Sequence, residues 1–294
     1  MFPSDLTTAQ YKQLERYLPI VKKTRPKKYS IHYLLNGILY ILKTGSPWRN
    51  LPESYPPWKS CHKFLTYLSR ENIFSHILFE LNKKERKEKG RSPTPSILVM
   101  YSCSKHSCEY LSLSKKGYDG FKKNHGIKLF TLVDTQGRLW RSLITTANTQ
   151  DKVGAEMIIS QNFESRKTTS NCFMVLGDMG FESKRLTNEL YRKYKVVLLT
   201  KRLKRKYKVK DNDQNRYNRM INNTRKRIID TRRWVVERTY AHQNKFRRLI
   251  TVFERTTKIY DSFVKLASIT LLLKRMGGEI FDRFMYGIPI CFKI

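Results

Sequence analysis

The chain has 294 residues, and its 59 Lys and Arg against 24 Asp and Glu give a formal net charge of +35 at pH 7. A share of 40% hydrophobic residues, with 12% aromatic ones, is enough for a packed core and excludes a disordered polycation. So large a positive excess on a folded protein indicates a polyanionic partner, most commonly nucleic acid. An acidic small-molecule substrate would not require it.

The cysteines and the apolar segments indicate the cellular compartment of the protein. The five cysteines are an odd number scattered along the chain, and the first residues lack the basic and apolar regions of a secretory signal. We therefore expect reduced thiols in a cytoplasmic, nucleoid-associated protein. The longest apolar stretches, such as 263–273, are too short and too interrupted to cross a bilayer, so no membrane partner is expected.

Residues 1–81 are predicted to form a small all-helical domain. Thr7 and Gln10 form a capping box that opens a first helix. Ser30 can cap a second helix, and Gly45 offers its C-terminal stop. This pattern of caps and stops is typical of short helices packed on one another.

A third helix is predicted after Trp58, with Lys59 and Lys63 on its outer side. It could enter a major groove in the manner of a helix-turn-helix motif. The alternative is an ordinary solvated helix face, because the connection before this helix is long for that motif. Trp48 and Trp58 are predicted to belong to the core rather than to stack on bases.

A change of composition separates this domain from the rest of the chain. Residues 82–96 are charged and contain Pro and Ser, which predicts a linker. Residues 97–276 are predicted to form a mixed α/β domain, interrupted by a very basic insertion at 201–233, and residues 277–294 form a tail of unassigned role. The predicted strands are 96–101, 125–135, 139–146, 172–178 and 195–200, and the predicted helices are 153–159, 183–194, 234–247 and 258–276.

Two acidic residues stand out because acids are scarce in this chain. Asp178 ends an apolar strand, and α/β sheets usually carry their sites at the carboxyl ends of strands. Glu237 is surrounded by cations, with Arg233 one turn before it. The structural alternative is that Asp178 caps the next helix and that Glu237 forms an ordinary ion pair with Arg233.

Three blocks of the sequence, in order, resemble a known family. They are Gly45–Pro52 (GSPWRNLP), Gly117–Asp151 (with GYDG, GIK and VDT) and Arg232–Leu249 (with RRWVVERTYA). They resemble the insertion-sequence DDE transposases of the insertion-sequence-five group. The similarity runs from about Leu6 to Met276 and leaves only the tail unmatched.

The resemblance implies an α/β fold in which a ribonuclease-H-like mixed sheet with flanking helices follows the helical domain. It also implies three carboxylates that bind two Mg²⁺ ions, with Asp178 as the second acid and Glu237 as the third. Two carboxylate-held ions activate the attacking oxygen and stabilise the leaving oxygen of a phosphodiester, and Mg²⁺ prefers oxygen ligands. The implied substrate is double-stranded DNA at the inverted-repeat ends of a bacterial insertion sequence, cut and joined by a homo-oligomer.

The first acid is where this sequence departs from the family. The family has an aspartate on the opening strand, and this chain has Tyr101 at that position. A phenol has an ordinary pKa of about 10 and is neutral at pH 7, so it cannot replace a carboxylate that bridges two cations. We expect impaired cleavage. Asp119 or Asp151 could lie within reach as a substitute, but we favour structural roles for both.

Candidate phosphate contacts are the basic residues near the family blocks and the outer residues of the third helix: Lys122, Lys123, Arg233, Arg238, Lys245, Arg247, Arg248, Lys59 and Lys63. Charge runs are usually solvated surface, but the overall excess favours DNA backbone binding with a steep salt dependence. Cys103, His106 and Cys108 suggest zinc only weakly, because no second ligand pair accompanies them.

Two other functions compete with an impaired transposase. One is a non-catalytic DNA-binding remnant that occupies element ends. The other is a basic structural protein of the ribosome or nucleoid, which would account for the charge but not for the ordered family blocks. Metal-dependent cleavage separates the first two, and preference for a terminal repeat separates both from the third.

Overall fold

The computed structural model describes residues 2–19, 28–164, 171–200 and 234–277. The predicted basic insertion 201–233 and all but the first residue of the predicted tail lie outside the described residues, as does Arg233. None of the described helices is both long enough and apolar enough to cross a membrane.

The N-terminal part, where residues 2–19 and 28–88 are described, contains four α-helices: α1 (Thr8–Glu15), α2 (Ile31–Thr44), α3 (Trp58–Arg70) and α4 (Ile73–Glu88). The predicted capping box is present at Thr7, and Ser30 caps α2 through the amide of Tyr33. Gly45 ends α2 with φ +74°, a conformation that glycine adopts without strain. A short 3₁₀ helix, η1 (Trp48–Asn50), leads towards α3. The predicted helical nature of this region is thus observed.

One six-stranded sheet forms the centre of the rest of the molecule. β1 (Ile97–His106), β3 (Asn124–Asp134) and β4 (Leu139–Thr146) are antiparallel neighbours, and β5 (Met174–Gly177) and β6 (Val197–Thr200) continue the sheet parallel to β1. The resulting order is β4-β3-β1-β5-β6, with the short β2 (Gly117–Asp119) paired to β3. This mixed sheet with flanking helices is the ribonuclease-H-like arrangement that the resemblance implied.

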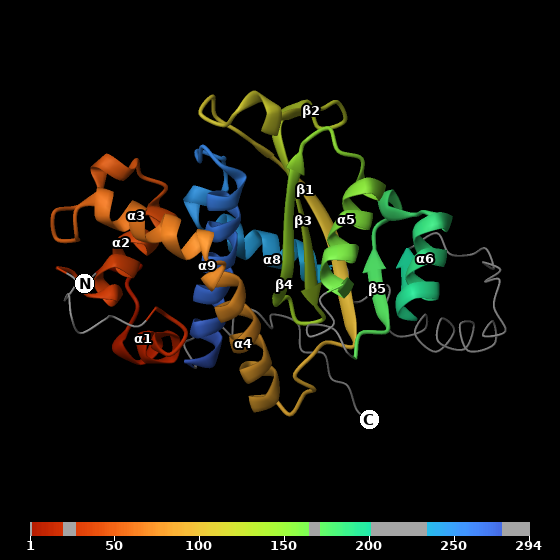
Figure 1. Ribbon diagram of the computed structural model, residues 1–294, viewed down its shortest axis with the longest axis horizontal. Helices are drawn as coiled ribbons and strands as arrows, with labels where there is room; N and C mark the ends of the chain where they lie inside the picture. Colours follow the sequence, from red (N-terminus) through yellow and green to blue (C-terminus); the bar gives the residue numbers. More distant parts are fainter. Residues whose placement is uncertain (1, 20–27, 165–170, 201–233, 278–294) are drawn as a thin grey trace.

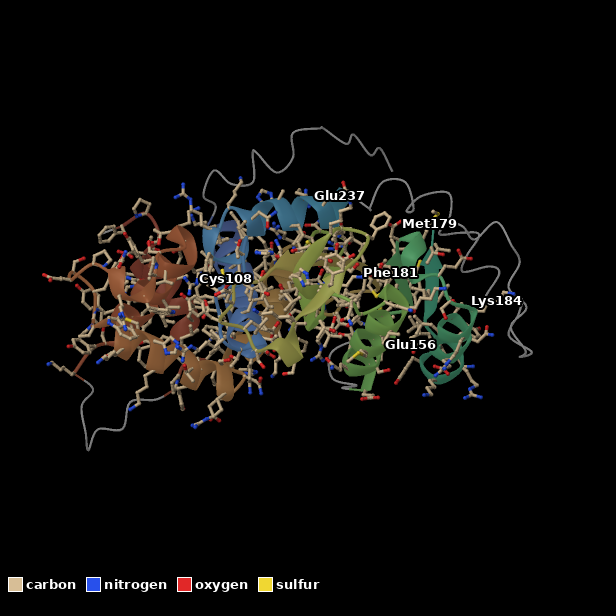
Figure 2. All side chains as sticks on the ribbon, turned by 90° about the horizontal axis from the view of Figure 1, so that it is seen from above. Cys108, Glu156, Met179, Phe181, Lys184 and Glu237 are labelled. Atoms are coloured by element: carbon tan, nitrogen blue, oxygen red, sulfur yellow. The ribbon has the colours of Figure 1, made fainter. Side chains whose placement is uncertain are left out.

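Helices cover both faces of the sheet (Figure 1). α5 (Asp151–Glu164) and α6 (Lys184–Tyr194) pack on one face, and α8 (Trp234–Asn244) and α9 (Thr257–Met276) lie on the other (Figure 2). The strands alternate accordingly: Leu98 and Met100 of β1 face α5 and α6, whereas Val99 faces α8 and α9. Short 3₁₀ helices η2 (Leu113–Lys115), η3 (Met179–Phe181) and η4 (Arg247–Leu249) join these elements.

α9 joins the helical part to the sheet. It lies between α3 and α4 on one side and β4 on the other, and it is buried almost all round from Tyr260 to Leu273. A helix that is apolar on every face requires such two-sided cover. One continuous hydrophobic core therefore runs from Leu6 through α9 to β1 and β5.

The prediction of a linker at 82–96 is wrong for the first half of that range. α4 continues to Glu88, and Asn82, Glu85 and Arg86 within it are buried. The charges resemble a solvated linker in the sequence, but they form ion pairs with the β3–β4 hairpin inside the protein. The predicted boundary at residue 81 therefore falls inside a helix.

Candidate active site and nucleic-acid interface

Tyr101 and Asp178 lie at the same level of two neighbouring strands. β1 and β5 are parallel, with Val99 opposite Leu176; two residues further on, β1 carries Tyr101, and Asp178 directly follows the end of β5. Adjacent strands are about 4.8 Å apart. The intervening pair is in contact as well, because Met100 Cε lies 3.5 Å from the position that a Cβ on Gly177 would occupy. The carboxyl end of β5 thus brings Asp178 beside Tyr101.

α8 crosses the same face of the sheet above Tyr101. The rings of Tyr101 and Tyr240 have centroids 5.2 Å apart, and Tyr240 Oη lies 3.1 Å from Oγ1 of Thr131, the residue opposite Tyr101 on β3. Burial raises the pKa of Tyr240 well above its ordinary value. Its neutral phenol therefore serves as an anchor between helix and sheet, and the Tyr101 ring packs against it.

Glu237 lies one turn before Tyr240 on α8, and its side chain is exposed. Figure 2 shows Glu237 on the outer side of α8, along the same border of the molecule as Met179, the residue that follows Asp178. The fold therefore brings the three predicted positions to one edge, although they are far apart in the sequence.

Asp178 has a structural contact as well. Its backbone is extended, and its Oδ1 accepts a hydrogen bond of 2.8 Å from the amide of Met179 at the start of η3. The predicted capping role is therefore present, on a short 3₁₀ helix that precedes α6. α6 itself is capped by Ser183.

The two candidate substitutes for the missing acid are held by protein groups. Asp151 Oδ1 accepts from Ser102 Oγ at 2.7 Å and pairs with Lys128 Nζ at 2.9 Å. Asp119 bonds Ser104 and accepts from the amides of two following residues. Burial alone would raise the pKa of Asp119, but these hydrogen bonds and Lys128 hold it below its ordinary value. The contacts of Asp119 and of Asp151 are those of structural carboxylates.

The residues at this edge do not fit a two-ion site. Tyr101 supplies a phenol where the third carboxylate is required, and within the described ranges there is no group of three His, Cys, Asp or Glu that could hold a metal ion. Of the weakly suggested zinc ligands, Cys103 and His106 are three residues apart on β1, so they point to opposite faces of the sheet.

The β3–β4 turn holds α8 in place. Thr239 Oγ1 donates to the carbonyl of Gly137 at 3.2 Å, and Arg238 Nη2 donates to the carbonyl of Gln136 at 3.3 Å. Gly137 has φ +81°, and a Cβ there would lie 2.6 Å from Thr239 Oγ1. Only glycine permits this close approach. Arg238, predicted to contact DNA, is half-buried and contacts this turn.

A buried group of four charges lies under the same turn. Asp134 accepts from Arg86 at 2.5 Å and from Arg138 at 2.9 Å, and Arg138 also pairs with Glu85. We call these residues the turn cluster. It joins α4 to the hairpin, so it fixes the turn on which α8 rests.

The predicted phosphate contacts separate into exposed and buried residues. Those with exposed side chains are Lys59, Lys63, Lys122, Lys123, Lys245 and Arg247. Arg248 is buried, pairs with Glu254 at 2.7 Å and donates to the carbonyl of Ser46 at 3.2 Å. Its guanidinium joins η4 to the end of α2, and we withdraw it from the predicted DNA contacts.

A pocket with a basic lining adds to the exposed cations. It lies where α2, the end of α8 and the end of α9 meet, and its lining includes Lys43, His242, Lys245 and Lys274. Burial, Lys274, Lys245 and Arg247 all lower the pKa of Lys43. Such mutual repulsion is the field that attracts an anion.

Two of these cations, Lys43 and Lys274, were not found from the sequence. They lie on helices 230 residues apart in the chain, and no local pattern places them together. Asp5 also lines the pocket, but its carboxylate oxygens accept hydrogen bonds from Tyr55 Oη and the amide of Phe2. Asp5 keeps its negative charge, and the three lysines still leave the lining with a net positive charge.

Comparison with known families agrees with this geometry. Residues 93–258 match the family described as "Transposase DDE domain", which is more than half of the chain. The chain belongs to the DDE transposases. Residues 6–78 of the transposase match a second family, described as "Putative transposase of IS4/5 family". Searches of curated proteins and of solved structures found no match.

Membership of this family has direct consequences for the chemistry. DDE transposases cleave and join DNA and generally use divalent metal ions. The substrate class is therefore DNA, in agreement with the net charge of +35. The edge formed by Tyr101, Asp178 and Glu237 is the candidate active site of this transposase.

Proposed function

We propose that this protein binds the inverted-repeat ends of its own insertion sequence and that Tyr101 impairs its cleavage and strand transfer. The observation that carries the proposal is the Tyr101 ring packed against Tyr240 beside Asp178. The phenol contributes no negative charge at pH 7. Asp178 and Glu237 remain as two carboxylates where two Mg²⁺ ions would require three.

The DNA path is the second part of the proposal. Exposed Lys122 and Lys123 lie beyond the end of β2, and Lys245 and Arg247 follow α8. We propose that these residues contact backbone phosphates, with Lys59 and Lys63 of α3 contacting DNA further along. The basic pocket at Lys43 adds cations next to Lys245, since α2 forms it together with the ends of α8 and α9.

Each such contact releases counterions from DNA. The affinity should therefore fall steeply with salt, with a slope of roughly −0.9 for each neutralised phosphate. Pairs of inverted ends would be bound by a homo-oligomer, as the symmetry of the repeats suggests. Fluorescence anisotropy against salt, with a duplex from one end of the element and a scrambled duplex, measures both affinity and end preference.

The decisive experiment on catalysis compares Tyr101→Asp with Tyr101→Asn. Both variants lose the ring contact with Tyr240, so they share its structural cost, and only the first restores a carboxylate. We expect Tyr101→Asp to nick end-containing duplex in Mg²⁺ at least about 100-fold faster than wild type, because the missing acid serves both ions. Tyr101→Asn should stay at the wild-type level.

Three outcomes would change the proposal. Wild-type cleavage equal to that of Tyr101→Asp would show that the tyrosine does not impair the site. A Tyr101→Asp variant that folds, by circular dichroism, and binds ends but does not cleave would favour the non-catalytic remnant. Binding without any preference for the terminal repeat would favour a basic structural protein instead.

A further inference from the structure

An almost fully exposed phenylalanine lies within the turn between β2 and β3. The side chain of Phe121 is 96% exposed, and Tyr110, at 68%, is the next of the exposed large apolar residues in the described ranges. Burying such a ring is favourable by about 2 kcal/mol. A ring held wholly in solvent therefore indicates a contact that forms only with a partner.

Hydrogen bonds within the chain hold the turn that carries Phe121. Asp119 Oδ1 accepts hydrogen bonds of 3.1 Å from the amides of both Phe121 and Lys122. Its other oxygen bonds Ser104 on β1. Lys123 takes the left-handed conformation, with φ +49°. The position of the ring is thus fixed by the strand that carries Tyr101.

The turn lies close to the candidate active site. Ser104 follows Tyr101 by three residues on β1, which is about 10 Å along a strand, and its side chain points to the opposite face of the sheet. Successive nucleotides of one DNA strand are about 3.4 Å apart, so this distance corresponds to about three of them. β2 lies at the end of the sheet towards which β5 points (Figure 1). Asp178 and the turn therefore lie towards the same end of the sheet.

The charges around the ring favour nucleic acid over a protein partner. Lys122 and Lys123 follow Phe121 directly, and Lys115 and Lys116 precede β2; Lys116 is half-buried and the other three are exposed. An apolar protein surface would gain nothing from this group of lysines, whereas a DNA strand offers phosphates to the lysines and bases to the ring. Aromatic stacking on a base contributes about 1–3 kcal/mol.

We propose that Phe121 stacks on, or inserts between, DNA bases about three nucleotides from the phosphodiester at the candidate active site. Lys122 and Lys123 would contact the flanking phosphates. Apolar side chains inserted into a base step partly unstack it and kink the duplex. The inference rests on the proposed function, because it requires DNA at the edge formed by Tyr101, Asp178 and Glu237.

The experiment uses the full chain and end-containing duplexes in which one adenine at a time is replaced by 2-aminopurine, whose fluorescence reports stacking. We expect wild type to change the fluorescence at one or two adjacent positions. Phe121→Ala should abolish that change and weaken binding about 5- to 100-fold. Phe121→Trp should retain both properties. Phe121 makes no core contact to lose, so its variants should fold.

A matched control is Phe173→Ala, which removes another partly exposed phenylalanine from the start of β5, at the opposite end of that strand from Asp178. It should leave fluorescence and affinity unchanged. Tight binding by wild type with no fluorescence change at any position, and equal affinity of Phe121→Ala, would overturn the stacking proposal alone. If wild type failed to bind the duplexes at all, the proposed function would fall with it.

One further outcome assigns the ring to a protein contact. Loss of self-association in Phe121→Ala, measured by analytical ultracentrifugation without DNA, with the 2-aminopurine signal unaltered, would place Phe121 between two copies of the chain. That result would also overturn the proposal.

Discussion

Two groups of carboxylates in this molecule differ in what surrounds them. In the turn cluster, Asp134 and Glu85 are buried and contact Arg86 and Arg138 directly. At the candidate active site, Asp178 is half-buried and Glu237 is exposed. The first group is committed to holding elements together, whereas the second remains accessible to a substrate.

The pKa values follow the same division. Burial by itself raises the pKa of Asp134, but Arg138 and Arg86 outweigh it and hold the pKa below its ordinary value. For Glu85, too, Arg138 and Lys89 outweigh the effect of burial. A charge inside a protein is tolerated only when its partners are this close. Acids with such partners are structural in this fold, however conspicuous they are in the sequence.

The substitution Asp134→Asn tests the difference between the two groups most strongly. The substitution keeps the shape but leaves Arg86 and Arg138 buried without their shared carboxylate. We expect the free energy of unfolding to fall by about 3–5 kcal/mol, measured by urea denaturation. Glu189→Gln is the control, because Glu189 pairs with Arg185 at the surface at 3.2 Å. A surface pair contributes less than about 1 kcal/mol, so equal losses in both variants would contradict the distinction.

What the sequence predicted correctly rests on local signals. The caps of α1 and α2 and the β3–β4 hairpin each depend on residues within a few positions of one another. α4 could not be predicted in the same way. Its charged second half resembles a linker because the partner of Arg86, Asp134, lies 48 residues further along the chain.

The candidate site shows the same limit. The sequence predicted that Asp178 lies at the carboxyl edge of the sheet, because it directly follows an apolar strand and strand ends are a local feature. The contact between Tyr101 and Tyr240 depends on how α8 crosses the sheet, which no spacing encodes. The exposure of Phe121 and the meeting of Lys43 with Lys274 likewise follow only from the folded chain.

An intermediate effect is expected from pH at the end of α8. Burial, together with Lys245, Arg275 and Arg238, lowers the pKa of His242 to about 4. The ordinary value is about 6.5. Between these values the unfolded chain binds the proton and the folded chain does not. The contribution of His242 to stability is therefore complete above pH 6.5 and is lost as the pH falls towards 4.

His242→Gln should flatten this part of the pH profile. We expect wild type to lose about 1–2 kcal/mol more than the variant between pH 6.5 and 4.5, after allowance for solvent screening at this half-buried site. Urea denaturation at several pH values measures the difference. Because acids such as Asp134 and Asp119 titrate in both proteins, their effect cancels in the comparison. Parallel profiles for the two proteins would show that His242 is not held neutral.

The smallest effect on stability is expected at the candidate active site itself. Asn is as good an N-cap as Asp, so Asp178→Asn should keep the contact with the Met179 amide, and Glu237→Gln changes an exposed side chain. Each should alter the free energy of unfolding by less than about 0.5 kcal/mol. In the Tyr101→Asp background, however, each should abolish the restored cleavage in Mg²⁺. A loss of stability comparable with that of Asp134→Asn, or cleavage that survives either substitution, would place Asp178 or Glu237 with the structural acids and leave the site without its remaining carboxylates.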